Sequence, residues 1–171
     1  MQNIKLQKEY EIFVEEMIER CKLIGLDINS FPIDHVCYRA KDIESFNTFL
    51  EMFQSISALY TIKSHHGRKF FTFFLKDALD YKNISSYVIE YSEPGGSDTY
   101  DNGFQHLELL TNKSYEDILD MDSRDVKDLV FEGKFGDEKY LKWSDKKVIK
   151  VKGIPLYYIS LSDEESEIVV I

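Results

Sequence analysis

The chain has 171 residues, of which 43% are hydrophobic and 14% aromatic, so it can build one sizeable core and is short for two. Its formal net charge of −10 repels phosphate backbones, which argues against general nucleic-acid binding. No apolar run approaches the roughly 18 residues of a membrane span, and the start has no apolar signal core. We therefore expect a single domain over residues 1–171 in the cytoplasm, with no nucleic-acid or membrane partner.

Two features of the composition support this expectation. Cys21 and Cys37 lack the spacing of a disulfide framework, which is typical of a reducing compartment. The lysines of residues 139–152 alternate with apolar residues, which predicts a strand pair with a solvated face and not a basic patch.

The first half of the chain predicts an added helix followed by a strand, a helix and three strands. Residues 9–24 have helical apolar spacing, and Gly25 supplies a stop. Residues 33–40 alternate as a strand, and Asp42 is a candidate N-cap for a helix over 43–53. Strands are then expected at 56–64, 69–76 and 85–92.

The same order of elements begins again in the second half. A strand is expected at 104–110, a helix at 115–129, and strand-like pieces at 130–135, 140–152 and 155–161. The acidic tail from Asp163 to Glu167 is expected to form a short final helix or a fraying end. Moving the chain by 71 positions places His35 on His106, so we predict two modules, at about residues 31–95 and 102–162.

Three of the predicted strands carry polar residues that share one face. The period of two puts His35 with Cys37 and Arg39, and His106 with Glu108, while Glu90 lies opposite its apolar neighbours. If helices cover the apolar faces, these side chains line the concave side of the sheet. Buried ionisable groups are costly unless they are paired or bind a cation.

Two imidazoles and a carboxylate can supply three ligands to a divalent metal ion and leave open positions for substrate. His35, Glu90 and His106 are therefore candidate ligands of a Lewis-acid centre. The alternative is that both histidines are hydrogen-bonded core or edge residues and that Glu90 pairs with Arg39. Cys37 is expected to be a small buried residue, and His65 and His66 to be exposed in a turn.

The segment Asp34-His35-Val36-Cys37-Tyr38-Arg39, the pair Gly67-Arg68, and Ile89-Glu90 followed by Gly103-Phe104-Gln105-His106-Leu107-Glu108 resemble the YecM-like family. That family belongs to the vicinal oxygen chelate superfamily, with glyoxalase I, methylmalonyl-CoA epimerase, bleomycin-resistance proteins and extradiol dioxygenases. The resemblance implies an α+β fold of two βαβββ modules that form a curved mixed sheet, a cup around a divalent metal ion.

The resemblance also implies which residues serve the site. It places metal ligands at His35, His106 and Glu90, and a fourth ligand within residues 156–160, where no carboxylate or histidine stands. Tyr158 could line the site instead, and Glu108 could act as an extra ligand or proton shuttle. Arg39 and Arg68 are candidates for holding an anionic substrate, because guanidinium matches carboxylate or phosphate; structural ion pairs are the alternative.

Two functions remain open at this point. One is a metal-dependent isomerase, epimerase, lyase or oxygenase that acts on a small carboxylated or oxygenated metabolite, with zinc, nickel, manganese or iron. The other is a non-catalytic protein that binds or sequesters a small molecule on the same scaffold, which the missing fourth ligand and the aromatic supply favour. Either could work as a monomer or a homodimer.

Overall fold

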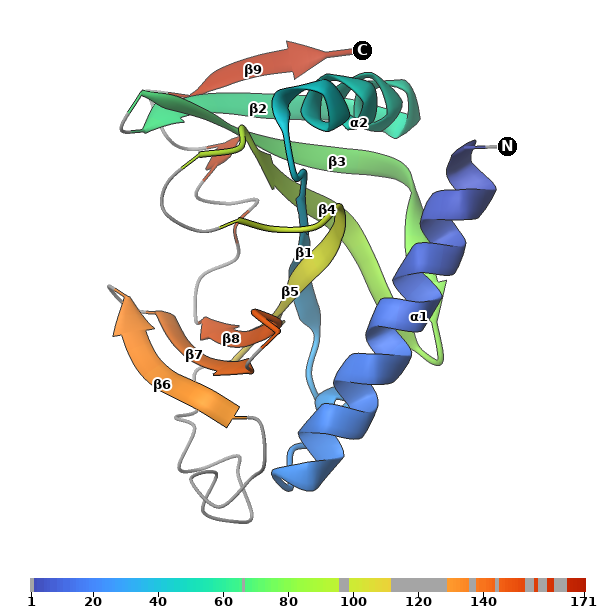
Figure 1. Cartoon of the computed structure of the whole chain (residues 1–171). Helices are drawn as coiled ribbons and strands as arrows, with labels where there is room; N and C mark the ends of the chain where they lie inside the picture. Colours follow the sequence, from blue (N-terminus) through green and yellow to red (C-terminus); the bar gives the residue numbers. More distant parts are fainter. Residues whose placement is uncertain are drawn as a thin grey trace.

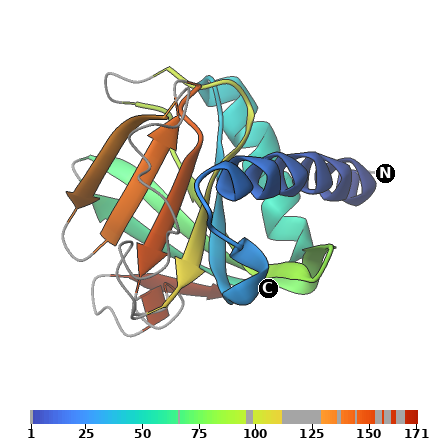
Figure 2. The ribbon, with the colours of Figure 1, turned by 90° about the horizontal axis from the view of Figure 1, so that it is seen from below.

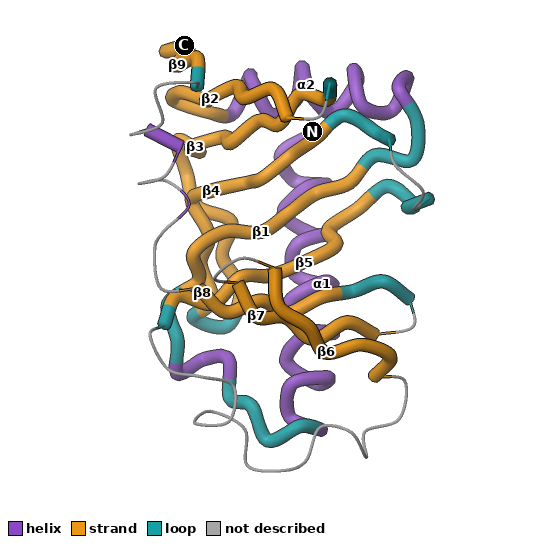
Figure 3. Tube along the Cα trace, turned by 90° about the vertical axis from the view of Figure 1, so that its left-hand side faces the viewer, coloured by secondary structure: helices purple, strands orange, loops and turns teal. Residues whose placement is uncertain are grey.

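The computed structural model describes residues 2–65, 67–95, 99–111, 129–135, 138–143, 145–152, 156, 160–161 and 166–171. Its strands are β1 (Ile33–Arg39), β2 (Ser57–His65), β3 (Arg68–Tyr81), β4 (Ile84–Ser92), β5 (Gly103–Leu110), β6 (Leu129–Phe135), β7 (Glu138–Trp143), β8 (Val148–Lys152) and β9 (Glu167–Val170). These strands form one mixed sheet in the order β6-β7-β8-β5-β1-β4-β3-β2-β9. The sheet is curved, and its concave face lies on the side opposite to the helices α1 and α2 (Figures 1 and 3).

Helix α1 (Gln2–Leu23) crosses the back of the sheet, beside β3 and β5 (Figure 1). Its buried side chains recur every three or four residues, among them Tyr10, Val14, Met17 and Cys21, which gives the helix one apolar stripe. The Tyr10 hydroxyl donates to the carbonyl of Ile84 over 3.0 Å, so this buried phenol has a partner. The helix ends before Gly25, whose φ of +71° suits glycine.

Helix α2 (Ile43–Ile56) covers the same face, above β2 and β3. Its N-cap is Asp42, as predicted, and the Asp42 carboxylate accepts from the Ser45 amide over 2.8 Å. Phe46 and Phe53 are buried under the helix and pack on Tyr91 of β4, with ring centroids 4.9 and 5.0 Å apart. Seen from below in Figure 2, both helices lie on one side of the sheet.

The sheet has two halves that mirror each other. The first half is β1–α2–β2–β3–β4, with β1 parallel to β4, and in the second half β5 is parallel to β8. The halves meet where β1 and β5 run antiparallel, and there His35 faces Glu108 while Cys37 faces His106. A shift of 71 positions exchanges these two pairs, which is what an internal twofold repeat requires. The helix predicted at 115–129 lies outside the described residues, except Leu129, which begins β6.

The strand pair expected over residues 139–152 is present as β7 and β8, with a turn at Lys146, whose φ is +68°. The strand expected over 155–161 needs correction, because the residues described there, Leu156, Ser160 and Leu161, are helical. The acidic tail from Asp163 to Glu167 lies outside the described residues, except that Ser166 is described and Glu167 begins β9, which pairs with β2.

Cys21 and Cys37 are both free thiols and both buried, as expected. Among the helices described, none is long and apolar enough to cross a membrane.

Candidate metal centre

Three central strands turn polar side chains toward the concave face of the sheet. Their neighbours in sequence, such as Val36, Ile89 and Leu107, belong to the core on the helix side. Because side chains alternate along a strand, the intervening residues point the other way. The polar set is His35, Cys37 and Arg39 on β1, Glu90 on β4, and His106 and Glu108 on β5.

The structure brings the three predicted metal ligands together. The Nε2 atoms of His35 and His106 lie 3.4 Å apart, and the Glu90 Oε2 atom lies 3.9 Å from His35 Nε2. Ligand atoms of all three residues lie within 4.8 Å of one another. Two nitrogens bound to one tetrahedral zinc ion at about 2.0–2.1 Å are themselves about 3.4 Å apart. The spacing of the two imidazoles therefore fits a shared metal ion.

Two β-bulges fix the orientation of the histidine rings. The β1–β5 register shifts between Ile33 and His35 and again between Cys37 and Tyr38, which leaves Asp34 and Gln105 as the extra residues. Each extra residue bonds the histidine that follows it: Asp34 Oδ2 lies 2.8 Å from His35 Nδ1, and Gln105 Oε1 lies 2.7 Å from His106 Nδ1.

These bonds determine which ring nitrogen can bind a cation. An ionised carboxylate only accepts hydrogen bonds, so the Nδ1 atom of His35 carries the proton and donates a hydrogen bond to Asp34. Gln105 donates its Nε2 to the Lys146 carbonyl over 2.6 Å, which turns its Oε1 toward His106. Both Nε2 lone pairs are then available to a metal ion, in the arrangement that outer carboxylates and amides give to metal-binding histidines.

Both predicted arginines lie beside the candidate ligands. Arg39 Nη2 donates to Glu90 Oε1 over 3.2 Å, while Arg39 Nη1 donates to Ser92 Oγ over 2.5 Å. Arg68 Nη2 donates to the same Ser92 hydroxyl over 3.2 Å and also to the Glu93 carbonyl. The ion pair between Glu90 and Arg39, which was the alternative interpretation of Glu90, is thus present. It involves Glu90 Oε1, whereas Glu90 Oε2 lies toward His35.

Glu108 is fully buried between an imidazole and an ammonium group. Its Oε2 lies 3.7 Å from His35 Nε2 and 3.8 Å from Lys150 Nζ. A second possible ligand group therefore exists, formed by Asp34, His35 and Glu108. Because the bond to Asp34 occupies His35 Nδ1, we take the first group as the better candidate.

Lys150 is the residue that corresponds to Glu90 in the second half of the sheet. Glu90 of β4 pairs with Cys37 of β1, and Lys150 of β8 pairs in the same way with Glu108 of β5, which the repeat aligns with Cys37. The resemblance placed a fourth ligand at residues 156–160, of which 157–159 lie outside the described residues, so this placement stays a prediction from sequence. Among the described residues, Lys150 of β8 occupies the position that corresponds to Glu90.

Burial and charge push the pKa values of the two histidines apart. Burial lowers the pKa of His35, but Glu108, Asp34 and Glu90 outweigh it, so the pKa is raised above its usual value. Burial, with Lys150 nearby, holds the pKa of His106 well below its usual value. Burial also opposes ionisation of Glu90, but Arg39 and the imidazoles lower its pKa, so the carboxylate is ionised at neutral pH.

Three residues at the centre escaped the sequence analysis: Asp34, Gln105 and Lys150. Strand alternation puts the first two on the wrong face, and only the bulges turn them inward. Their one signal is that each precedes a repeated histidine. Tyr158 lies outside the described residues, whereas Leu156 donates its amide to Asp34 Oδ2 over 2.9 Å. His65 is exposed, as expected, and His66 also lies outside the described residues.

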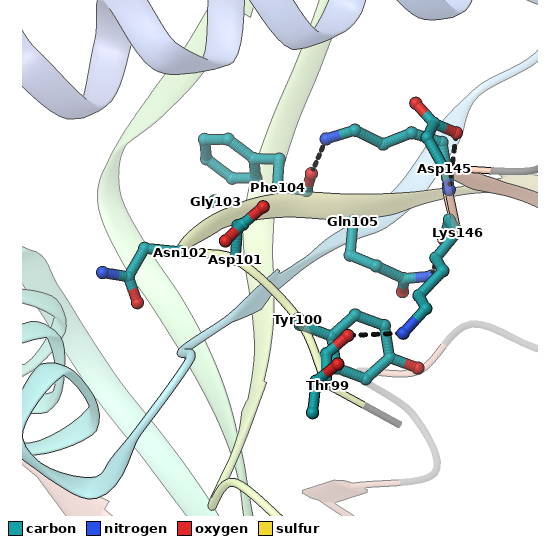
Figure 4. A pocket seen from close by; sticks show the side chains of 10 residues that line it. Thr99, Tyr100, Asp101, Asn102, Gly103, Phe104, Gln105, Asp145 and Lys146 are labelled. Atoms are coloured by element: carbon teal, nitrogen blue, oxygen red, sulfur yellow. Dashed lines mark hydrogen bonds between the residues drawn. The ribbon is translucent and has the colours of Figure 1, made fainter. Parts of the chain in front are cut away.

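A cavity of about 390 Å³ lies at the start of β5, lined by residues 99–105 and 145–147 (Figure 4). Figure 4 shows the Lys146 ammonium bonded to the Thr99 carbonyl, over 2.5 Å. Gln105 lines this cavity and also holds the ring of His106, so it connects the cavity to the candidate ligands.

Comparisons with known proteins give the family and the fold of this chain. A solved structure described as "Structural Genomics, Protein EC4020" is 17% identical and superposes with a TM-score of 0.78, over 94% of this chain and 92% of that chain. An integron cassette protein from the mobile metagenome of V. cholerae is 16% identical over 70% of this chain and 91% of its own, with a TM-score of only 0.20. No curated protein matches. The model of the YecM protein family matches residues 2–152, and the chain therefore belongs to the YecM family.

Proposed function

We propose that this protein is a divalent-metal-dependent enzyme of the vicinal oxygen chelate type. It would act as an isomerase, epimerase, lyase or oxygenase on a small carboxylated or oxygenated metabolite. The observation that carries the proposal is the 3.4 Å separation of the His35 and His106 Nε2 atoms, with both Nδ1 atoms already bonded. Glu90 Oε2 is the third ligand, and zinc, nickel, manganese or iron are the candidate ions.

The arrangement of the sheet supports the superfamily assignment. Its two halves each place a parallel strand beside a central strand, and the candidate ligands sit on those strands at the junction. A divalent ion there would act as a Lewis acid on a carbonyl oxygen of the substrate. One ion shared by both halves accounts for histidines that repeat across the junction.

The chain's own residues supply binding and proton transfer. Arg39 and Arg68 meet at Ser92 and would hold an anionic group of the substrate. Glu108, 3.7 Å from His35 Nε2, is placed to accept a proton or to serve as an extra ligand. A role for Tyr158 stays a prediction from sequence. The partner would be a small molecule, the location cytoplasmic and the state monomer or homodimer, with no nucleic acid involved.

Lys150 favours a second candidate function, a non-catalytic protein that binds or sequesters a small molecule on the same scaffold. A lysine at the fourth position adds positive charge where a fourth ligand would strengthen metal binding. The pairing of Glu90 with Arg39 also stabilises the cluster without a metal ion. A protein that needs no ion would respond to carboxylated or aromatic metabolites in a metal-free thermal shift, without turnover.

Elemental analysis separates the two candidates. The protein is purified without affinity tag or chelator beside the His35→Ala/His106→Ala variant, with His65→Ala as a control because His65 is an exposed histidine on β2. We expect roughly one divalent ion per chain in the wild type and the control, and none in the double variant. No ion in the wild type, even after each metal is added back, would favour the metal-free binder.

A further inference from the structure

A divalent ion would add positive charge to a buried cluster that already contains cations. Among the side chains that the structure describes, this cluster includes the carboxylates and cations of Asp34, Glu90, Glu108, Arg39, Arg68 and Lys150. The charge of +2 that the ion brings needs a negative partner, because uncompensated charge in a buried site is costly.

Lys150 is the cation that faces the second half of the site. Its Nζ lies 3.8 Å from Glu108 Oε2, which in turn lies 3.7 Å from His35 Nε2. Its side chain is 21% exposed, so it is largely buried and still reachable from the concave face. The mirrored strand places Glu90, a candidate ligand, at the corresponding position.

We infer that Lys150, which stands at the position of a fourth metal ligand, instead provides a binding group for an anion. The metal-loaded centre would then select a small dianionic carboxylate as the ligand that does not come from the protein. The inference rests on the proposed metal centre. One dianion cancels the charge that the ion brings, and the ammonium group of Lys150 meets the negative end of that ligand beside the open coordination positions. Glu108 positions Lys150 and is not itself a ligand when the anion is bound.

The test uses the cobalt(II)-loaded protein and oxalate as the probe, with acetate as the monoanion for comparison. Visible absorption reports the coordination of the ion, so an anion that enters its coordination sphere changes the spectrum without any need for turnover. The variants are Lys150→Met and Lys150→Arg, and the control is Lys76→Met, because the Lys76 ammonium faces the Ser55 carbonyl on α2.

We expect oxalate to bind the wild type and Lys76→Met equally, and Lys150→Met at least roughly ten-fold more weakly, as loss of a charge-assisted partner predicts. Lys150→Arg, which keeps the charge, should stay within about three-fold of the wild type. Acetate should bind much more weakly than oxalate.

Equal oxalate affinity in the wild type and Lys150→Met would overturn the inference and leave the metal centre standing. A wild type that takes up no cobalt would overturn the proposed function and this inference with it. If Lys150→Met does not fold, judged by circular dichroism, Lys150→Glu takes its place. That variant restores a carboxylate at the mirrored position, so it should bind cobalt more tightly and lose the oxalate response; an unchanged response would overturn the inference.

Discussion

Replacing Asp34 by asparagine tests whether the β1 bulge supports a metal ligand. Asp34 is buried and makes two kinds of bond, to His35 Nδ1 over 2.8 Å and to the Leu156 amide over 2.9 Å. Asparagine has the same size, but one of the two oxygens becomes an NH2 group. With its oxygen at the Oδ2 position it can still accept from both donors, but its NH2 group then lies where Asp34 Oδ1 is, 3.1 Å from the Leu156 amide, so two donors face each other. The substitution also removes the negative charge that makes His35 a stronger electron donor.

Loss of an outer partner of a metal-binding histidine costs about 10–100-fold in metal affinity. For Asp34→Asn this corresponds to about 1.4–2.7 kcal/mol of binding free energy. The NH2 group that faces the Leu156 amide, in place of an acceptor oxygen, costs the metal-free fold about 1–3 kcal/mol as well. Both losses arise at one residue, because a single carboxylate contacts both His35 and Leu156.

The assay is a competition titration against a chromophoric chelator at about pH 8, where protonation of His35 competes least. Asp77→Asn serves as the control, because Asp77 is an exposed aspartate on β3 and its loss changes the net charge equally. A metal affinity for Asp34→Asn within about two-fold of the control would refute the argument, since the bond to His35 would then contribute nothing to binding.

Three further predictions concern the fold around the site. Asp145 forms a two-point ion pair with Arg20 of α1. Burial raises the pKa of Asp145, but the bond to Arg20 outweighs burial, so the pKa is lowered in the folded protein. The ion pair therefore stabilises the fold above the unfolded pKa of about 3.8, and this stabilisation is lost as pH falls through the folded pKa. Asp145→Asn should therefore lower the free energy of unfolding by no more than about 1 kcal/mol near pH 7, where solvent screens the half-exposed pair, and by progressively less as pH falls below about 3.8; a pH-independent gap would contradict this. Phe53→Ala should cost about 3–5 kcal/mol in urea unfolding, because the ring is fully buried against Tyr91, and a loss below about 1 kcal/mol would refute that packing. Cys21 and Cys37 should not react with a thiol reagent in the folded protein, because burial raises the pKa of both; fast labelling would contradict their burial.

The convergence of His35, Glu90 and His106 could be predicted from sequence because strand alternation is a strict rule. Each residue interrupts an apolar strand at a position that alternation assigns to the concave face, and the 71-residue repeat links the two histidines. Asp34 and Gln105 could not be predicted in this way. A bulge adds one residue to a strand, and no periodicity in a single sequence marks where that happens.

Lys150 was missed because the two halves differ in length. The histidines are 71 positions apart, whereas Glu90 and Lys150 are only 60 apart, since β6 and β7 are shorter than β2 and β3. A constant shift of 71 positions from Glu90 leads to Leu161, which lies beyond the corresponding strand, β8. Strand β9 was also missed, although the apolar run that follows the acidic residues has high strand propensity.

Anomalous diffraction from crystals grown with the bound ion shows whether His35, Glu90 and His106 share one metal ion. Data collected at the absorption edge of that ion locate it independently of any assumed ligand. We expect one peak about 2.0–2.1 Å from the Nε2 atoms of both His35 and His106, next to the Glu90 carboxylate. A peak between Asp34 and Glu108 instead, or no peak at the histidines although the protein binds the ion in solution, would contradict this expectation.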